Sequence, residues 1–159
     1  METLLTMDLS EISLMEKEAR SLVTVEIDRN TTFDRQVEMI TVETQKYQLR
    51  RLHDASYGTM ISVESLYHGD YDDYSKLFIE IPFPVQKTGL HIQPCGTYLR
   101  TFYQGDWQKM SMKYREIFAY AQKHHLQLTG FSYEMIINGN VTDRMEEYIV
   151  QIEIPVYRK

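Results

Sequence analysis

The stretch Ile79-Glu80-Ile81-Pro82 recurs as Ile152-Glu153-Ile154-Pro155, and each copy closes a segment with the same order of expected elements. Similarity that recurs at a fixed spacing indicates a repeated architecture. Two copies of about seventy residues are too few for a solenoid, so they indicate a duplicated domain with a seam between similar halves. Such a seam is a natural place for a small-molecule cleft.

Composition sets limits on the class of protein. A chain of 159 residues with 43% hydrophobic and 25% charged residues is typical of a soluble globular domain. Its net charge of −6 disfavours duplex DNA or an anionic membrane as a direct partner. We expect neither a membrane-spanning segment nor a secretory signal, because no apolar run approaches about 18 residues. Cys95 is the only cysteine, which excludes an internal disulfide and suits the reducing cytoplasm.

The first half is expected to form two strands, a helix and two more strands. Val23, Val25 and Ile27 alternate with polar residues, which is typical of a half-buried strand. Thr31 opens a helix-start box, although the β-branched run 37–42 leaves a strand open as an alternative. The expected ranges are strands 12–16 and 21–28, a helix from Phe33 to Tyr47, and a hairpin of strands 57–66 and 74–82 across His68-Gly69-Asp70.

The second half repeats this order with clearer signals. Asp106 is a plausible N-cap for a helix whose apolar stripe runs from Trp107 to Ala121. The expected strands are 90–93, 97–103, 126–137 and 147–156, with a turn at Asn138-Gly139-Asn140. The sequence therefore predicts an α+β fold of two tandem ββαββ repeats, with antiparallel sheets, helices on one face and a ligand cleft between the repeats.

These patterns also predict the domain boundaries. Residues 1–9 are interpreted as a tail or linker stub, and residues 10–157 as a single domain. Within it, repeat one covers residues 10–84 and repeat two covers residues 88–157.

Glu134 is the candidate functional residue, because it is the only charge between Phe131 and Ile137. Strand alternation places Phe131, Tyr133, Met135 and Ile137 on the face suited to packing on the helices, and Ser132, Glu134 and Ile136 on the other face. That other face could be solvated, in which case a lone glutamate costs nothing. Alternatively, two such faces could wall a cleft, where a desolvated carboxylate is costly unless a cation pairs with it.

Four short motifs occur in the order expected of one known family: Ala55-Ser56-Tyr57-Gly58, Pro94-Cys95-Gly96-Thr97-Tyr98, Ser132-Tyr133-Glu134-Met135-Ile136-Ile137 and Glu146-Glu147-Tyr148. On the duplicated frame, they make the chain resemble the effector-binding domain of the GyrI-like superfamily. The resemblance is strongest to the drug-binding C-terminal domain of BmrR-type regulators in the MerR family, and it covers roughly residues 10–157.

The resemblance implies a cleft that binds lipophilic, often cationic, aromatic compounds without transforming them. It implies Glu134 as the central acidic residue and Tyr57, Tyr98 and Tyr148 as wall tyrosines. It also implies contact with DNA only indirectly, through an N-terminal winged-helix domain that this sequence lacks, and a dimer in a full-length regulator. The chain is then an excised effector domain or a stand-alone relative.

Two residues qualify this site. Arg100 shares a strand face with Tyr98, so its guanidinium could neutralise Glu134 and remove a preference for cations. Strand parity also places Tyr148 in a row with Val150 and Ile152, which indicates a core position unless a bulge reorients it.

No cofactor, metal site or catalytic residue is predicted. The histidines and Cys95 show no ligand spacing, and neither a nucleophilic triad nor a glycine-rich phosphate loop is present. Two alternatives to ligand sensing remain open. Some GyrI-like relatives hydrolyse reactive cyclopropane-containing compounds, for which Glu134 and a cleft tyrosine could orient or deprotonate water. Gyrase-inhibitory relatives instead bind a protein partner.

Overall fold

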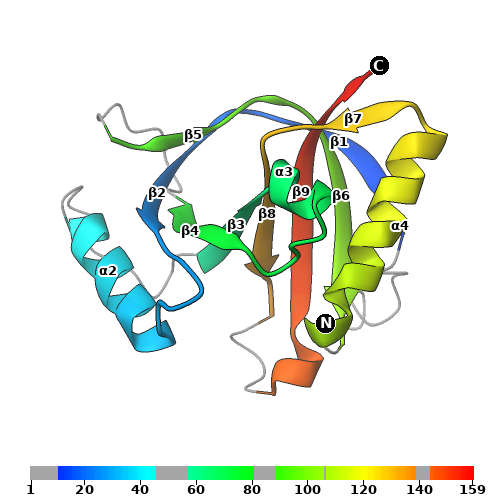
Figure 1. Ribbon diagram of the computed structural model, residues 1–159. Helices are drawn as coiled ribbons and strands as arrows, with labels where there is room; N and C mark the ends of the chain where they lie inside the picture. Colours follow the sequence, from blue (N-terminus) through cyan, green and yellow to red (C-terminus); the bar gives the residue numbers. More distant parts are fainter. Residues whose placement is uncertain (1–10, 46–56, 81–88, 106, 139–143) are drawn as a thin grey trace.

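The structure is a computed structural model that describes residues 11–45, 57–80, 89–105, 107–138 and 144–159. The fold is α+β, with a curled antiparallel sheet that forms a half-barrel and a few helices (Figure 1). The first half contributes β1 (Ser13–Lys17), β2 (Arg20–Glu26), α2 (Phe33–Gln45), β3 (Tyr57–Ser62), α3 (Val63–Tyr67) and β4 (Tyr74–Glu80). The second half contributes β5 (His91–Gln93), β6 (Gly96–Gln104), η1 (Trp107–Lys109), α4 (Met110–Lys123), β7 (Leu126–Leu128), β8 (Phe131–Ile136), η2 (Met145–Glu147) and β9 (Ile149–Arg158).

The strand order confirms the internal duplication. It runs β1-β6-β9-β8-β3-β4-β2-β5, with β7 paired to β9 outside this path. If β5, β6, β8 and β9 are matched with β1, β2, β3 and β4, the order reads the same from either end. The seam is therefore the antiparallel pair β3·β8, and the repeated Ile-Glu dipeptide lies in the matched strands β4 and β9.

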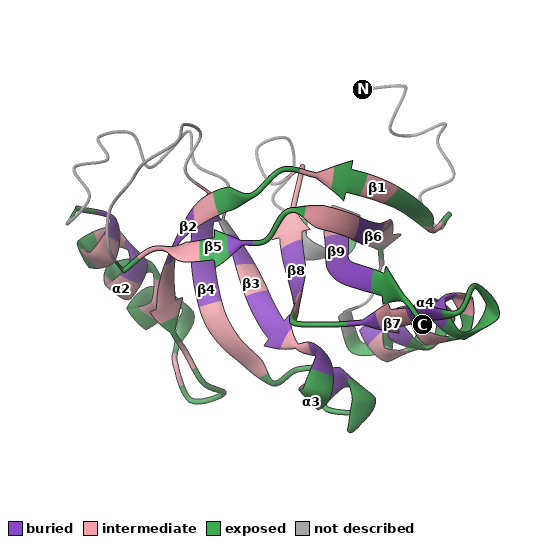
Figure 2. Ribbon diagram, turned by 90° about the horizontal axis from the view of Figure 1, so that it is seen from above, coloured by how far each residue is buried: buried purple, intermediate pink, exposed green. Residues whose placement is uncertain are grey.

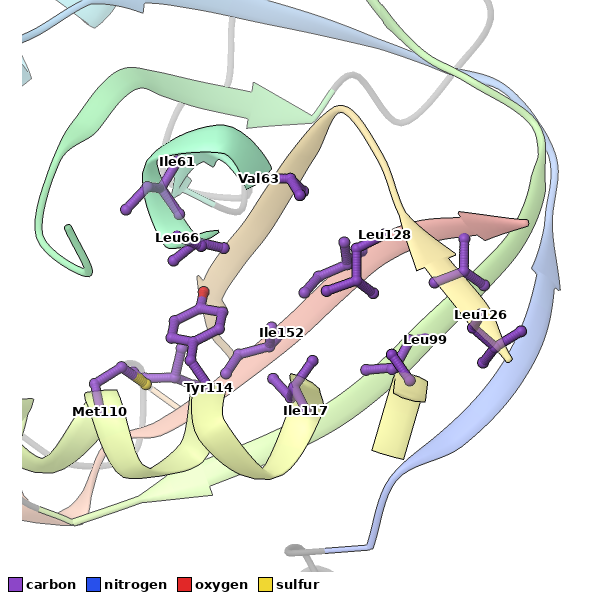
Figure 3. Close-up of a cluster of buried hydrophobic side chains, with 14 residues drawn as sticks. Ile61, Val63, Leu66, Leu99, Met110, Tyr114, Ile117, Leu126, Leu128 and Ile152 are labelled. Atoms are coloured by element: carbon purple, nitrogen blue, oxygen red, sulfur yellow. The ribbon is translucent and has the colours of Figure 1, made fainter. Parts of the chain in front are cut away.

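Both long helices cover the same face of the sheet, at opposite ends (Figures 1 and 2). The ladder places Leu77, Thr59, Glu134 and Ile152 opposite one another across β4, β3, β8 and β9. Cross-strand partners point to the same face, so this row lies on one side of the sheet. Leu77 packs under α2, in a cluster with Val23, Ile40 and Ile79. Ile152 packs under α4, in a larger cluster that includes Leu66, Leu99, Met110, Tyr114 and Ile117 (Figure 3).

The opposite face has its own apolar cluster, formed by Leu22, Met60, Phe78, Tyr98 and Tyr133. Only two residues separate β1 from β2 and β5 from β6, so each of these segments crosses from one edge of the sheet to the other. This crossing brings Leu22 of β2 close to Tyr98 of β6 and curls the sheet. Among the described residues, no helix is long and apolar enough to cross a membrane.

The structure corrects several expected boundaries. The run 37–42 is helical, so the strand alternative is wrong. The expected strand 57–66 ends at Ser62, whose hydroxyl accepts a hydrogen bond from the Ser65 amide and caps α3. The expected strand 126–137 divides into β7 and β8 at Gly130, whose φ of +69° suits a glycine turn. Residues 1–9, Asp106 and the Gly139-Asn140 part of the expected turn lie outside the described residues.

Gly58 of β3 lies very close to the Phe78 ring and to the backbone of β8. A Cβ at this position would lie 2.3 Å from Cζ of Phe78 and 2.7 Å from the carbonyl oxygen of Glu134. Both distances are too short for a methyl group. The Glu134 oxygen cannot easily move aside, because it belongs to the backbone of β8, which pairs with β3. Glycine at position 58 therefore lets β3 pair closely with β8.

We expect Gly58→Ala to lower the free energy of unfolding by about 1–3 kcal/mol, because it overpacks this contact. Chemical denaturation of the variant and of wild type measures the loss. Combining it with Phe78→Leu removes the ring atoms but not the backbone clash, so the double variant should lose less than the sum of the two single variants. Strict additivity of the two losses would contradict the contact.

Candidate ligand-binding site

A pocket of about 500 Å³ opens on the helix-bearing face of the sheet. From the first half it is lined by the β2–α2 connection, α2, β3 and β4, and from the second half by β8 and β9. The lining includes Phe33, Thr59, Tyr74, Leu77, Glu134 and Val150. A cleft between the two repeats is therefore present, and its volume is typical of small-molecule sites.

Glu134 lies in this pocket with only 4% of its surface exposed. The Tyr74 hydroxyl donates to its Oε1 at 2.8 Å, and the Tyr114 hydroxyl donates to its Oε2. The Tyr114 oxygen also lies 2.8 Å from Oγ of Ser132. Within the described part of the chain, no lysine or arginine lies within ion-pair distance of the Glu134 carboxylate. The interpretation of a solvated outer face is thus wrong.

Burial governs the ionisation of this group. It raises the pKa of Glu134 to about 7, and the hydrogen bonds from Tyr114 and Tyr74 offset only part of that increase. Burial also raises the pKa of both phenols, and the neighbouring carboxylate raises it further. The two tyrosines therefore remain protonated donors, while Glu134 changes charge near neutral pH.

The alternation of side chains in β8 is as predicted, but the faces are reversed. Phe131, Tyr133 and Met135 pack in the cluster on the side away from the helices. Ser132 and Glu134 face Tyr114 of α4. The reversal has a packing reason, because Phe78 and Met60 on the far side supply an apolar cluster that the curled sheet encloses.

Two of the three expected wall tyrosines, Tyr98 and Tyr148, do not line the pocket that holds Glu134. Tyr98 is fully buried in the far-side cluster, where its hydroxyl donates to the Pro94 carbonyl oxygen at 2.5 Å. Tyr148 is half-buried between η2 and β9 and does not line the pocket, and since it precedes β9, strand parity does not apply to it. Tyr57 begins β3 beside the pocket-lining Gly58, but its side chain lies outside the described part.

Arg100 does not neutralise Glu134. Its Nη2 atom lies 2.9 Å from Oε2 of Glu153, and Nζ of Lys17 lies 2.8 Å from Oε1 of the same glutamate. Glu153 pairs with Tyr133 across the ladder, so this charged cluster lies on the face away from Glu134. The doubt that Arg100 cast on a preference for cations is therefore removed.

Sequence reasoning missed the two tyrosines that do contact Glu134. Tyr114 belongs to the predicted apolar stripe of the second helix, and its place in that stripe does not single it out as a functional residue. Its hydroxyl is the missed signal, because a buried phenol requires a hydrogen-bond partner. Tyr74 begins β4, and no local pattern distinguishes it from the other tyrosines.

The mouth of the pocket carries charges. Arg29, Asp28 and Asp72 belong to its lining, as does Phe33, which is 76% exposed. Nη2 of Arg29 lies 3.2 Å from Oδ1 of Asp72 and 3.9 Å from Oδ1 of Asp70. This ion pair joins the β2–α2 connection to the α3–β4 connection.

The other histidine, cysteine and acidic side chains that the structure describes do not suggest a different chemistry. Across the described ranges, no cluster of three or more histidine, cysteine, aspartate or glutamate side chains could hold a metal ion. Cys95 is exposed. His91 contacts Tyr133 on the far face, where burial and the nearby Lys76 lower its pKa.

No family model matches the sequence, and no curated protein matches it. Solved structures do resemble it. The C-terminal domain of EcmrR aligns with a TM-score of 0.64 and 15% identity over 94% of this chain and 98% of that one. The EcmrR chain in a complex with DNA aligns with a TM-score of 0.68 and 16% identity. The alignment covers 94% of this chain but only 58% of the EcmrR chain.

Two further structures share the fold. A hydrolase from Listeria innocua aligns with a TM-score of 0.62 and 10% identity over 98% of this chain and 96% of that one. SAV2435, bound to tetraphenylphosphonium, aligns with a TM-score of 0.51 and 15% identity over 92% of this chain and 94% of that one. The chain therefore has the fold of the EcmrR C-terminal domain. At these identities the likeness concerns the fold alone, and function depends on the site.

The raised pKa of Glu134 makes the stability of the domain depend on pH. A carboxyl whose pKa is about 7 when folded and 4.5 when unfolded binds its proton more tightly in the folded state. The resulting stability is fully present below pH 4.5 and is lost as the pH rises through 7, by as much as about 3 kcal/mol.

We therefore expect Glu134→Gln to abolish this loss and to be more stable than wild type at pH 8. Urea denaturation between pH 5 and pH 8 measures the free energy of unfolding of both proteins. Because both contain the same histidines, the difference between their pH dependences reports on Glu134. The exposed Glu18→Gln is the matched control and should follow wild type. If the free energy of unfolding of Glu134→Gln fell with pH as steeply as that of wild type, the raised pKa would not belong to Glu134.

Proposed function

We propose that this chain is a ligand-sensing domain of a transcriptional regulator, which binds a small, lipophilic, cationic aromatic compound. The cytoplasm is its proposed location, and contact with DNA is proposed to occur only through a separate DNA-binding segment. The ligand shifts the domain towards the conformation that it binds best, and this shift is the signal.

The observation that carries this proposal is the buried Glu134 carboxylate, which has no lysine or arginine beside it in the described part of the chain. Its ionised form is costly in this setting, and two phenol donors offset only part of that cost. A bound cation would supply the missing opposite charge beside Glu134, whose burial means that water screens the interaction weakly. The apolar lining would meanwhile bury the aromatic body of the ligand.

The structural neighbours support the same proposal. EcmrR is found in a complex with DNA, and SAV2435 is found with tetraphenylphosphonium. That compound is a lipophilic cation with four aromatic rings, which is the chemistry that the Glu134 pocket favours. It is therefore a suitable first probe.

We expect tetraphenylphosphonium to bind about tenfold more tightly at pH 8 than at pH 6, because Glu134 ionises near pH 7. Isothermal titration calorimetry at the two pH values measures the change. Glu134→Gln should bind about tenfold or more weakly at pH 8 and should lose the pH dependence.

Tetraphenylborate is the control ligand, because it places the same four rings around a negative charge. Its affinity should be unchanged or higher in Glu134→Gln, and Glu18→Gln should bind both ions as wild type does. Binding of tetraphenylphosphonium with equal affinity by wild type and Glu134→Gln would overturn the site assignment.

A hydrolase is the second candidate, and one observation favours it. A carboxylate with a pKa of about 7 beside a tyrosine hydroxyl suits general acid–base catalysis near neutral pH. The fold is also shared with the Listeria innocua hydrolase. Glu134 would then orient or deprotonate water for attack on a reactive cyclopropane-containing compound.

Multiple turnover decides between the two candidates. If the domain is only a sensor, mass spectrometry should detect no more hydrolysed cyclopropane compound with wild type than with Glu134→Gln. Product in molar excess over wild-type protein, absent with Glu134→Gln, would establish the hydrolase instead.

A further inference from the structure

Arg29 is the only basic residue among the described residues that line the pocket. It lies at the mouth, whereas Glu134 lies buried within. A positive charge at this place opposes the entry of a cation and favours that of an anion. The charges of the residues next to Arg29 therefore decide whether the mouth of the pocket is net positive or net negative.

The acidic residues at the mouth are not equivalent. Oδ1 of Asp28 accepts hydrogen bonds from the Asn30 amide at 2.8 Å and the Thr31 hydroxyl at 3.2 Å, so its carboxylate is committed to the turn before α2. Asp72 instead faces Arg29 across the gap between two connections. Its side chain is 77% exposed, and that of Arg29 is 56% exposed.

We propose that the Arg29–Asp72 ion pair is a charge gate that sets which sign of lipophilic ion enters the pocket. This inference rests on the proposed ligand-binding function and assigns a specificity role to two residues outside the Glu134 cluster. In the closed pair the two charges cancel. Because an exposed ion pair contributes little to stability, an arriving cation can take the place of the guanidinium beside Asp72 at small cost.

The two members of the pair act in opposite directions. Without Arg29, the Asp72 and Asp70 carboxylates are left uncompensated and attract cations. Without the Asp72 carboxylate, the guanidinium keeps only the more distant Asp70 at 3.9 Å and attracts anions. At the separations within one pocket mouth and in dilute salt, each change corresponds to roughly a threefold change in affinity for a singly charged ligand.

The test compares tetraphenylphosphonium with tetraphenylborate, whose equal shape isolates the sign of the charge. Titrations at pH 8 and about 20 mM salt give the affinity ratio of cation to anion for wild type, Arg29→Gln and Asp72→Asn. The matched control is Arg35→Gln, which removes an arginine that is equally exposed and pairs with Glu38 on α2 but does not line the pocket.

Because each variant changes the cation and anion affinities roughly threefold in opposite directions, we expect Arg29→Gln to raise the ratio about tenfold and Asp72→Asn to lower it about tenfold. Raising the salt to about 500 mM should remove most of this difference, because the charges are exposed. Arg35→Gln should keep the wild-type ratio.

The gate is overturned if both variants keep the wild-type ratio, or if both change it in the same direction, while tetraphenylphosphonium binding still depends on Glu134. The proposed function itself fails in a different way, namely if wild type binds neither ion or if Glu134→Gln binds both as wild type does. The two failures are therefore distinguishable in one set of titrations.

Discussion

The structure depends on one constraint, which is that a carboxylate lies buried at the seam of two halves, with no positive charge beside it among the residues that the structure describes. Within the described ranges, the side chain of Glu134 accepts hydrogen bonds from two phenol hydroxyls, one from β4 and one from α4. Hydrogen bonds from neutral donors stabilise the ionised form less than a cation would. The group is therefore poised between two protonation states, and a positively charged ligand favours the ionised one.

The duplication explains why the seam is available. Each half covers its own end of the sheet with a helix, α2 over β2 and β4, and α4 over β6 and β9. Neither helix fills the space over the middle of the β3·β8 pair, and the pocket occupies that space. The same antiparallel pairing aligns Thr59 with Glu134 and carries the acidic side chain into that space.

The sequence predicted the architecture well, because repetition and periodicity report on which elements form. It predicted Glu134 as an isolated charge in an apolar strand, and it predicted the alternation along β8. It could not predict which face of β8 meets the helices, because both faces carry apolar residues and the curl of the sheet encloses the far one. It could not place Tyr98 either, because its burial depends on β1–β2 and β5–β6 crossing the sheet. The contacts of Tyr74 and Tyr114 with Glu134 likewise join residues sixty and twenty positions away along the chain.

The fold alone does not distinguish a sensor from a hydrolase, since the EcmrR C-terminal domain and a hydrolase from Listeria innocua both share it. The physical difference lies in what Glu134 must do with its proton. A hydrolase needs the carboxylate to reach a water molecule and to exchange the proton during each turnover. Here both carboxylate oxygens already accept phenol hydroxyls, and one of those phenols is further fixed by Ser132. Such a fixed carboxylate suits holding a charge better than transferring a proton, and this difference supports the proposed binding function over the proposed hydrolase.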